Sequence, residues 1–169
     1  MPDMDNITYR PIRTTDFDAL HTIVSDWNVT RQLGGWPWPP NPEFTKSRCK
    51  PYEGEGFVWA ICDDDRLIGT LGVTNRSIGY QLSPTHHRRG ITKAAATYAI
   101  NRGFDELGHD TIVATTWHDN AASHGLLTGL GFAQYQLIYE RGAARNYPTL
   151  ARHYRLPRAR WDRLRNPAQ

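Results

Sequence analysis

The chain has 169 residues, of which 39% are hydrophobic and 22% charged, a size and balance typical of one soluble globular domain. Its net charge of +3, from 20 Lys and Arg against 17 Asp and Glu, is too small and too dispersed to indicate a nucleic-acid partner. With no apolar run long enough to span a membrane and no apolar signal-peptide core, we expect a cytoplasmic protein without a membrane partner. The two cysteines, Cys49 and Cys62, are expected to be free thiols.

Hydrophobic spacing predicts that the first half of the chain folds as a strand, then helices, then three antiparallel strands. Thr15 is expected to cap the first helix, with Asp18 in the capping-box position. Proline and glycine exclude regular structure at residues 34–42. In chain order, the predictions are a strand at 7–12, a helix at 15–25, that irregular loop, a short helix at 42–50, and strands at 57–62, 67–74 and 76–82.

The second half is predicted to alternate helices with strands. In chain order, the predictions are a helix at 90–107, a strand at 111–117, a helix at 120–130, strands at 132–139 and 149–156, and a short terminal helix at 157–164. The helix at 90–107 makes a parallel crossover between two strands. The whole order predicts an α+β fold in a single domain spanning residues 1–169, with 157–169 as a short C-terminal helix and tail.

One basic turn, PTHHRRGITKAAA at residues 84–96, leads directly into a predicted helix. A helix N-terminus presents unpaired backbone N–H groups and a partial positive charge. Gly90 lets a ligand approach the backbone closely, and the forked guanidinium groups of Arg88 and Arg89 suit phosphate oxygens. These features predict an anion site for phosphate or pyrophosphate. A solvated basic turn at a helix start is the alternative that these residues alone leave open.

A second stretch places polar residues on an otherwise apolar helical stripe. Asn120, Ser123, Leu127 and Leu130 share one face of the predicted helix. Two polar residues on a core-facing stripe suit a position beside a ligand. Helix capping by Asp119 or Asn120 is a compatible alternative.

Taken in order, IGYQLSP, HHRRGIT and DNAASHGLLTGLGF resemble the GCN5-related N-acetyltransferase (GNAT) superfamily, and the branch looks like the acetyltransferases of ribosomal-protein N-termini (RimJ/RimL-like). The resemblance covers nearly the whole chain. It implies a mixed, mostly antiparallel twisted sheet flanked by helices and splayed between two strands. Acetyl-coenzyme A would bind in that splay, and the acceptor would approach from the opposite side.

The resemblance also implies which residues bind the coenzyme. His87 opens the phosphate loop where relatives have Gln or Arg, Gly90 keeps the glycine position, and Thr92 replaces a Gly or Ala. Ala94 stands where relatives often have glutamate. The implied coenzyme-binding residues are Gln81, Leu82, His87, Arg88, Arg89, Gly90, Ile91, Thr92, Lys93, Asn120 and Ser123.

The implied activity is that of an acetyl-CoA-dependent N-acetyltransferase, in which a primary amine attacks the thioester directly. A backbone N–H at Gln81 or Leu82 would stabilise the oxyanion. Asn120 and Ser123 are the implied catalytic residues: Asn120 would bind pantetheine, and Ser123 would protonate or stabilise the departing thiolate. No general base is evident. The candidates are His118, Asp119 and Glu140, and a chain of water molecules is the alternative.

The acceptor is expected to carry an amine, on a protein N-terminus or a small molecule, and the sequence does not choose between them. Trp27, Trp36 and Trp38 either wall the acceptor site or pack on the core. Arg141 and Arg145 are expected to be solvated, with contact to the acceptor as the alternative. No metal is expected, because the seven histidines form no ligand triad.

Two further matters stay open at this point. A homodimer is an option, and the basic C-terminal segment is expected to dock on the body of the protein or on a dimer partner. The rival functions are a non-catalytic coenzyme A-binding sensor or assembly module and, more weakly, a phosphate- or nucleotide-binding regulator.

Overall fold

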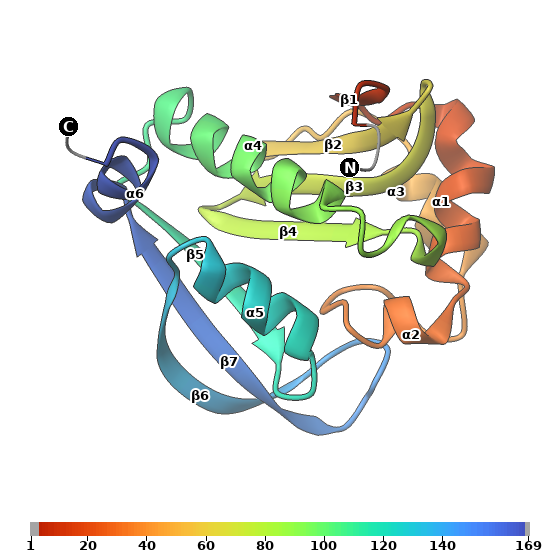
Figure 1. Cartoon of the computed structure of the whole chain (residues 1–169). Coiled ribbons are helices and arrows are strands. Elements are labelled where there is room, and N and C mark those ends of the chain that lie inside the picture. The colour runs from red at the N-terminus through yellow and green to blue at the C-terminus, as the bar shows by residue number, and fades with distance from the viewer. Residues whose placement is uncertain (1–3, 168–169) are drawn as a thin grey trace.

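Seven strands form one sheet in the order β1-β2-β3-β4-β5-β7-β6, in a computed structural model that describes residues 4–167 (Figure 1). All neighbouring strands pair antiparallel except β4 and β5, which are parallel. The strands are β1 (Ile7–Pro11), β2 (Gly56–Asp63), β3 (Arg66–Thr74), β4 (Ser77–Leu82), β5 (Thr111–Trp117), β6 (Ala133–Arg141) and β7 (Pro148–Pro157). The predicted α+β fold with a mixed, mostly antiparallel sheet is confirmed.

Helices cover both faces of the sheet. They are α1 (Phe17–Val24), α2 (Trp27–Thr30), α3 (Pro42–Arg48), α4 (Ile91–Asp105), α5 (Ala121–Gly129) and α6 (Arg158–Arg165), with 3-10 turns at Thr14–Asp16 and Pro84–His86. The larger apolar core lies under α4 and includes Leu71, Ile78 and Ile100. The smaller core lies under α1, where Leu20 packs with Ala60. The two clusters take alternate side chains of the same strands, as a sheet covered on both faces requires.

The feature that positions the site is the divergence of β4 from β5. Their ladder contains one residue pair, Ser77 opposite Val113, supported by a hydrogen bond of 2.9 Å from Val113 N–H to Arg76 O. Beyond this pair, β4 continues to Leu82 and β5 to Trp117 without further pairing. The sheet is therefore splayed between these strands, as the family resemblance implied, with α4 and α5 on one face of the opening (Figure 1).

The predicted elements agree with the structure to within about two residues at most boundaries, but the first helix begins differently. Thr15 lies inside a 3-10 turn, and α1 begins only at Phe17, so the predicted Thr15 cap is wrong. The reason is Asp16, whose carboxylate accepts hydrogen bonds from Arg13 N–H (2.7 Å) and from the Arg10 guanidinium (2.8 and 2.9 Å). The short helix α2 was also not predicted.

The C-terminal helix α6 docks on the body of the protein rather than standing free. Trp161 is buried, and its Nε1 donates to Asn101 Oδ1 on α4 (2.8 Å). Arg165 pairs bidentately with Asp105, and Arg158 donates to Phe104 O at the end of α4. Basic groups at the C-terminus of α4 also suit its dipole. This outcome fits the first of the two docking partners expected for the basic segment; residues 168–169 lie outside the described chain.

Cys49 and Cys62 are free and buried, as predicted, and burial raises the pKa of both thiols. Among residues 4–167, no helix is both long and apolar enough to cross a membrane. The same residues contain no group of three or more His, Cys, Asp or Glu that could hold a metal ion.

Candidate active site

The turn between β4 and α4 is held in place by three polar contacts. A ring nitrogen of His87, Nε2, lies 3.0 Å from Leu82 O, at the end of β4. Asp63, at the end of β2, pairs with His86 at 3.4 Å and with Arg89 at 3.9 Å. His87 thus braces the strand end with its side chain, and Arg88 is left exposed with a left-handed φ of 62°.

Gly90 begins α4 in a conformation that favours glycine. Its φ is +78°, and a Cβ added there would meet nothing within 4 Å, so the space beside it is open. The first hydrogen bond of the helix runs from Ala94 N–H to Gly90 O, and the amides of Ile91, Thr92 and Lys93 therefore precede the helical ladder. The Ile91 side chain is buried in the core, which leaves only its amide for a ligand. The arrangement suits an anion.

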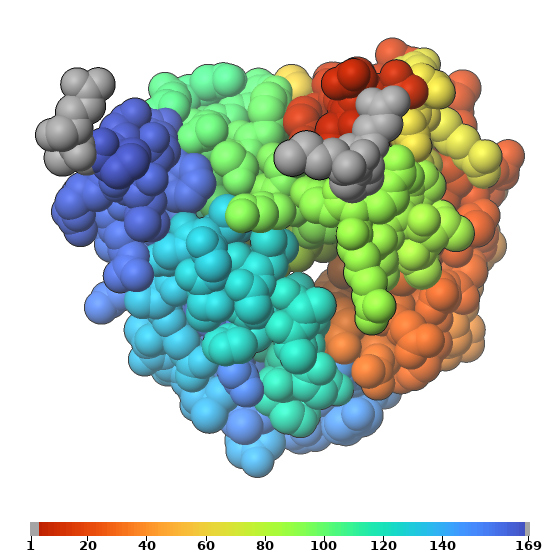
Figure 2. Space-filling view, in the orientation of Figure 1, coloured from red at the N-terminus to blue at the C-terminus, as the bar shows by residue number. Residues whose placement is uncertain are grey.

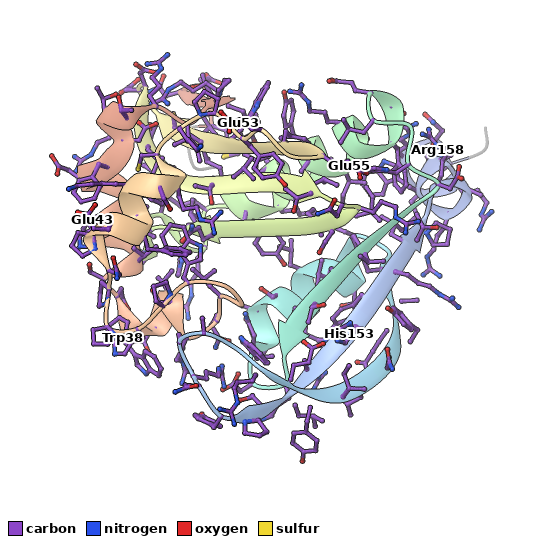
Figure 3. The ribbon with its side chains drawn as sticks, turned by 180° about the vertical axis from the view of Figure 1, so that it is seen from behind. Trp38, Glu43, Glu53, Glu55, His153 and Arg158 are labelled. Atoms are coloured by element: carbon purple, nitrogen blue, oxygen red, sulfur yellow. The ribbon has the colours of Figure 1, made fainter. Side chains whose placement is uncertain are left out.

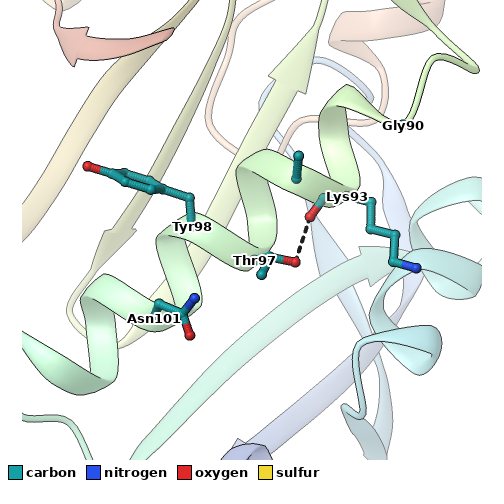
Figure 4. A pocket seen from close by; sticks show the side chains of 6 residues that line it. Gly90, Lys93, Thr97, Tyr98 and Asn101 are labelled. Atoms are coloured by element: carbon teal, nitrogen blue, oxygen red, sulfur yellow. Dashed lines mark hydrogen bonds between the residues drawn. The ribbon is translucent and has the colours of Figure 1, made fainter. Parts of the chain in front are cut away.

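A shallow groove continues from Gly90 along the outer side of α4 (Figure 4). It is lined by Gly90, Lys93, Ala94, Thr97, Tyr98 and Asn101. Thr97 Oγ1 donates to Lys93 O (2.8 Å), while the Lys93 ammonium and the Tyr98 ring point to different sides of the helix. The groove thus joins one free cation to the open helix terminus.

Across the splay, Asn120 and Ser123 begin α5. Asn120 Oδ1 accepts a hydrogen bond from Ser123 N–H (3.1 Å), so the capping interpretation of Asn120 is confirmed. The Ser123 hydroxyl meets Tyr80 of β4. Burial raises the pKa of Tyr80 to about 12, while the hydrogen bond with Ser123 acts in the opposite direction. The phenol is therefore protonated at neutral pH, and β4 and α5 are linked by a polar contact beside the opening.

A second polar cluster lies behind this contact. The hydroxyl of the fully buried Tyr154 lies 2.8 Å from His124 Nδ1 and 3.3 Å from Thr116 Oγ1. Sequence reasoning missed Tyr80 and Tyr154. The available signal was strand alternation, which puts Tyr80 on the same face as the core residues Ile78 and Leu82.

Gln81 points to the opposite face of β4 from Tyr80. It is 7% exposed, and in the described part of the chain its Oε1 has no hydrogen-bond partner. Buried polar atoms are nearly always paired. A polar ligand group that donated a hydrogen bond to this oxygen would therefore satisfy it. Figure 2 shows a hollow on the α4 and α5 side, framed by the green segment after β4, the teal start of α5 and the orange segment near α2.

The three candidate bases differ in their surroundings. A hydrogen bond from Arg145 lowers the pKa of Asp119, which makes its carboxylate a weak proton acceptor. Glu140 Oε1 lies 2.8 Å from His153 Nε2, on the side of the sheet away from α5 (Figure 3). His118 is exposed at the end of β5.

One expectation about the loops is wrong, and another is partly resolved. Arg145, expected to be solvated, is 8% exposed and fully engaged in hydrogen bonds, whereas Arg141 is exposed as expected. Trp27 and Trp38 pack against each other with ring centroids 5.0 Å apart, each about one third exposed, and Trp36 packs on the smaller core. Trp38 lies at the outer corner of the molecule in Figure 3.

Comparison with known proteins places these features in a family. Residues 6–133 match the family model described as "Acetyltransferase (GNAT) domain". The chain is 29% identical over 158 residues to the uncharacterized N-acetyltransferase YoaA of Bacillus subtilis (strain 168), covering 83% of this chain and 89% of that protein.

Solved structures share the fold at low identity. Mycobacterium smegmatis RimJ in complex with CoA-disulfide has a TM-score of 0.76 at 18% identity, covering 90% of this chain and 82% of that one. The ribosomal-protein-S5-alanine acetyltransferase from Vibrio fischeri has a TM-score of 0.73 at 18% identity, covering 94% and 97%. The acetyltransferase yncA from Salmonella typhimurium, with its cofactor acetyl-CoA, has a TM-score of 0.69 at 17% identity, covering 90% and 94%.

The family model covers most of the chain, and the splayed sheet agrees with it. The protein is therefore an acetyltransferase enzyme that belongs to the GNAT acetyltransferase domain family.

Proposed function

We propose that the protein is an acetyl-CoA-dependent N-acetyltransferase that moves an acetyl group to a primary amine by direct attack on the thioester. The observation that carries this proposal is the splay of β4 from β5, which lies between the open N-terminus of α4 and the Ser123 hydroxyl. Bound acetyl-CoA supplies the activated acetyl group. The residues around the splay would bind the coenzyme and stabilise the reacting groups.

The phosphate end of the coenzyme would meet α4. The amides of Ile91, Thr92 and Lys93 offer N–H donors with the positive end of the helix dipole, and Arg88, Arg89 and Lys93 add formal charge. Gly90 leaves room for close approach. His87 stands where the family has Gln or Arg. Its contact with Leu82 O would hold the loop against β4 in place of those side chains.

The reacting end would lie between β4 and α5. The edge of β4 that leaves β5 extends to Gln81 and Leu82, and a backbone N–H of one of these two residues would stabilise the oxyanion. The Asn120 side-chain oxygen fixes the first turn of α5, and its amide nitrogen would contact pantetheine. Ser123 donates a proton or a hydrogen bond to the departing sulfur, with Tyr80 as its neutral partner.

The acceptor is an amine on a protein N-terminus or a small molecule. Similarity of fold to RimJ and to the S5-alanine enzyme supports the RimJ/RimL-like branch. At 18% identity, each of these two comparisons establishes the fold only. A homodimer and a cytoplasmic location stay predictions of the sequence.

Thermal unfolding with acetyl-CoA tests the proposal first, with ATP and NAD as controls. At 100 times its dissociation constant, a ligand adds about 2.7 kcal/mol to the free energy of unfolding. A stabilisation by acetyl-CoA alone, followed by coenzyme A release with one member of an amine panel, would support the proposal. Stabilisation without release for any amine would favour the coenzyme A-binding sensor. No stabilisation at millimolar ligand would refute both.

A further inference from the structure

Arg145, in the loop between β6 and β7, is the most completely bonded arginine near the splay. Its Nε donates to Arg31 O (2.8 Å), and its two terminal nitrogens donate to Asp119 Oδ1 and Oδ2 (2.7 and 3.0 Å). One of them also donates to Gln32 Oε1 (3.0 Å). Its side chain is 4% exposed. A buried guanidinium with a bidentate carboxylate is a rigid connection, because its fork fixes both partners.

These partners come from two separate parts of the fold. Arg31 and Gln32 follow α2, which contacts α1 on the β1–β4 half of the sheet. Asp119 follows β5 on the other half. The backbone adds a parallel contact, from Ala143 N–H to Gly34 O (3.0 Å). Figure 1 shows the loop between β6 and β7 beside the segment that follows α2.

The indole of Trp117 packs beneath the Arg145 guanidinium. The Arg145 guanidinium stacks over the Trp117 ring at 5.4 Å, and Trp117 ends β5. A Cβ added at Gly142 would lie 2.6 Å from Trp117 Cζ2, so the loop backbone touches the ring. Glycine at this position lets the loop come close enough for Arg145 to reach across.

The two halves of the sheet are consequently joined at both ends of the splay. At the narrow end they share the pair Ser77 and Val113, and at the wide end they share the contacts of Arg145. Asp119 directly precedes Asn120, whose Oδ1 holds Ser123 N–H. The position of the Ser123 hydroxyl relative to β4 therefore depends on where Arg145 holds Asp119.

We infer that Arg145 is a positioning residue, which clamps the wide end of the splay through Asp119, Arg31 and Gln32 and thereby sets Ser123 against the cofactor cleft. This inference rests on the proposed function, since it assigns a purpose to Ser123. It predicts that losing the clamp harms the acetyl-transfer step more than the binding of acetyl-CoA, whose phosphates would lie at the distant α4 terminus.

The test compares Arg145→Gln, Ser123→Ala and the double variant with the unaltered protein and with Arg163→Gln, an exposed arginine on α6. Acetyl-CoA affinity is measured by calorimetry, and coenzyme A release is measured with the best amine of the panel. We expect Arg145→Gln to change the dissociation constant of acetyl-CoA by less than about threefold and to lower kcat at least tenfold. Arg163→Gln should change neither.

The double variant separates positioning from general destabilisation. If Arg145 acts through Ser123, the double variant should be no slower than Ser123→Ala alone, because coupled residues are not additive. If the fold-loss of kcat in the double variant equals the product of the two single losses, the inference is wrong and the proposed function still stands. An unchanged kcat in Arg145→Gln would have the same meaning. An unaltered protein without acetyl-CoA binding would instead refute the proposed function. If Arg145→Gln fails to fold, Asp119→Asn removes the ion pair at a more exposed position and takes its place in the same cycle.

Discussion

Tyr80 on β4 and Ser123 on α5 interact across the opening that begins where β4 leaves β5. The phenol is partly buried and protonated, so Ser123 has a neutral partner. A hydroxyl in this setting can give its proton to a departing thiolate and be reoriented by the phenol. This relationship leads to the first two predictions.

Ser123→Ala should lower kcat for acetyl transfer by about 100-fold, the lower range for loss of a positioned proton donor. The dissociation constant of acetyl-CoA should change little, because the amides of α4 remain. Steady-state kinetics with calorimetry would check both values. Unchanged kcat would show that Ser123 does not protonate the sulfur. Thr128→Ala, on the exposed side of the same helix, serves as the matched control.

Tyr80→Phe should make the protein less sensitive to alkaline unfolding. Because burial raises the pKa of Tyr80 from 10 to about 12, the folded state holds its proton more tightly than the unfolded state. The stabilisation is fully present below pH 10 and is lost as the pH rises toward 12, and its size is about 3 kcal/mol. Urea unfolding at pH 8, 10 and 11 would follow about the first half of this loss. An identical pH slope in the variant would contradict the assignment.

Gly90→Ala should weaken acetyl-CoA binding at least tenfold and also cost about 1 kcal/mol of stability, since alanine tolerates a φ of +78° poorly. Gly108→Ala provides a close control, because Gly108 has a φ of +70°, open space around it and a place at the other end of α4. The two variants should lose similar stability, and only Gly90→Ala should lose affinity. Equal affinities in calorimetry would remove Gly90 from the phosphate site.

Acid stability should depend on Asp16. Burial alone would raise the pKa of this carboxyl, but hydrogen bonds from Arg10 and Arg13 outweigh burial and lower it. The folded state therefore favours the ionised form. Its stabilisation is present above the unfolded pKa of about 4 and is lost as the pH falls through the lower folded value.

Asp16→Ala should accordingly cost about 3 kcal/mol at pH 7, because it leaves the Arg10 guanidinium without its buried partner, and less at pH 3. Asp65→Asn, at the exposed partner of Arg10, should have little effect. Denaturant unfolding at the two pH values would compare them. A pH-independent loss in Asp16→Ala would mean that packing rather than charge dominates.

The elements that periodicity could reveal were predicted well from sequence. Strands β2 to β5 alternate or run apolar over short lengths, and α4 carries a clear helical pattern, so local spacing specifies them. The apolar part of the α5 stripe was also predicted correctly, because Leu127 and Leu130 are both buried. These signals are local, and a single sequence records them.

The parts that were missed depend on contacts between distant residues. Arg145 meets Asp119, 26 positions away, and Arg31, 114 positions away, and no local pattern distinguishes it from the solvated Arg141. Tyr80 finds Ser123 only once the sheet is assembled. The Thr15 cap failed for the same reason, because Arg10 on β1 draws Asp16 into an ion pair that local capping rules do not include.

The single residue pair between β4 and β5 has a further consequence for solubility. Beyond Ser77 and Val113, both strands present unpaired N–H and C=O groups, as edge strands do, yet they stand fourth and fifth in the sheet order. Unpaired edges at the rim of a sheet invite pairing with other chains and aggregation. Here α4 and α5 flank these groups on one face, and the Arg145 loop closes their far end. The fold therefore shields these two strand edges from pairing with another polypeptide.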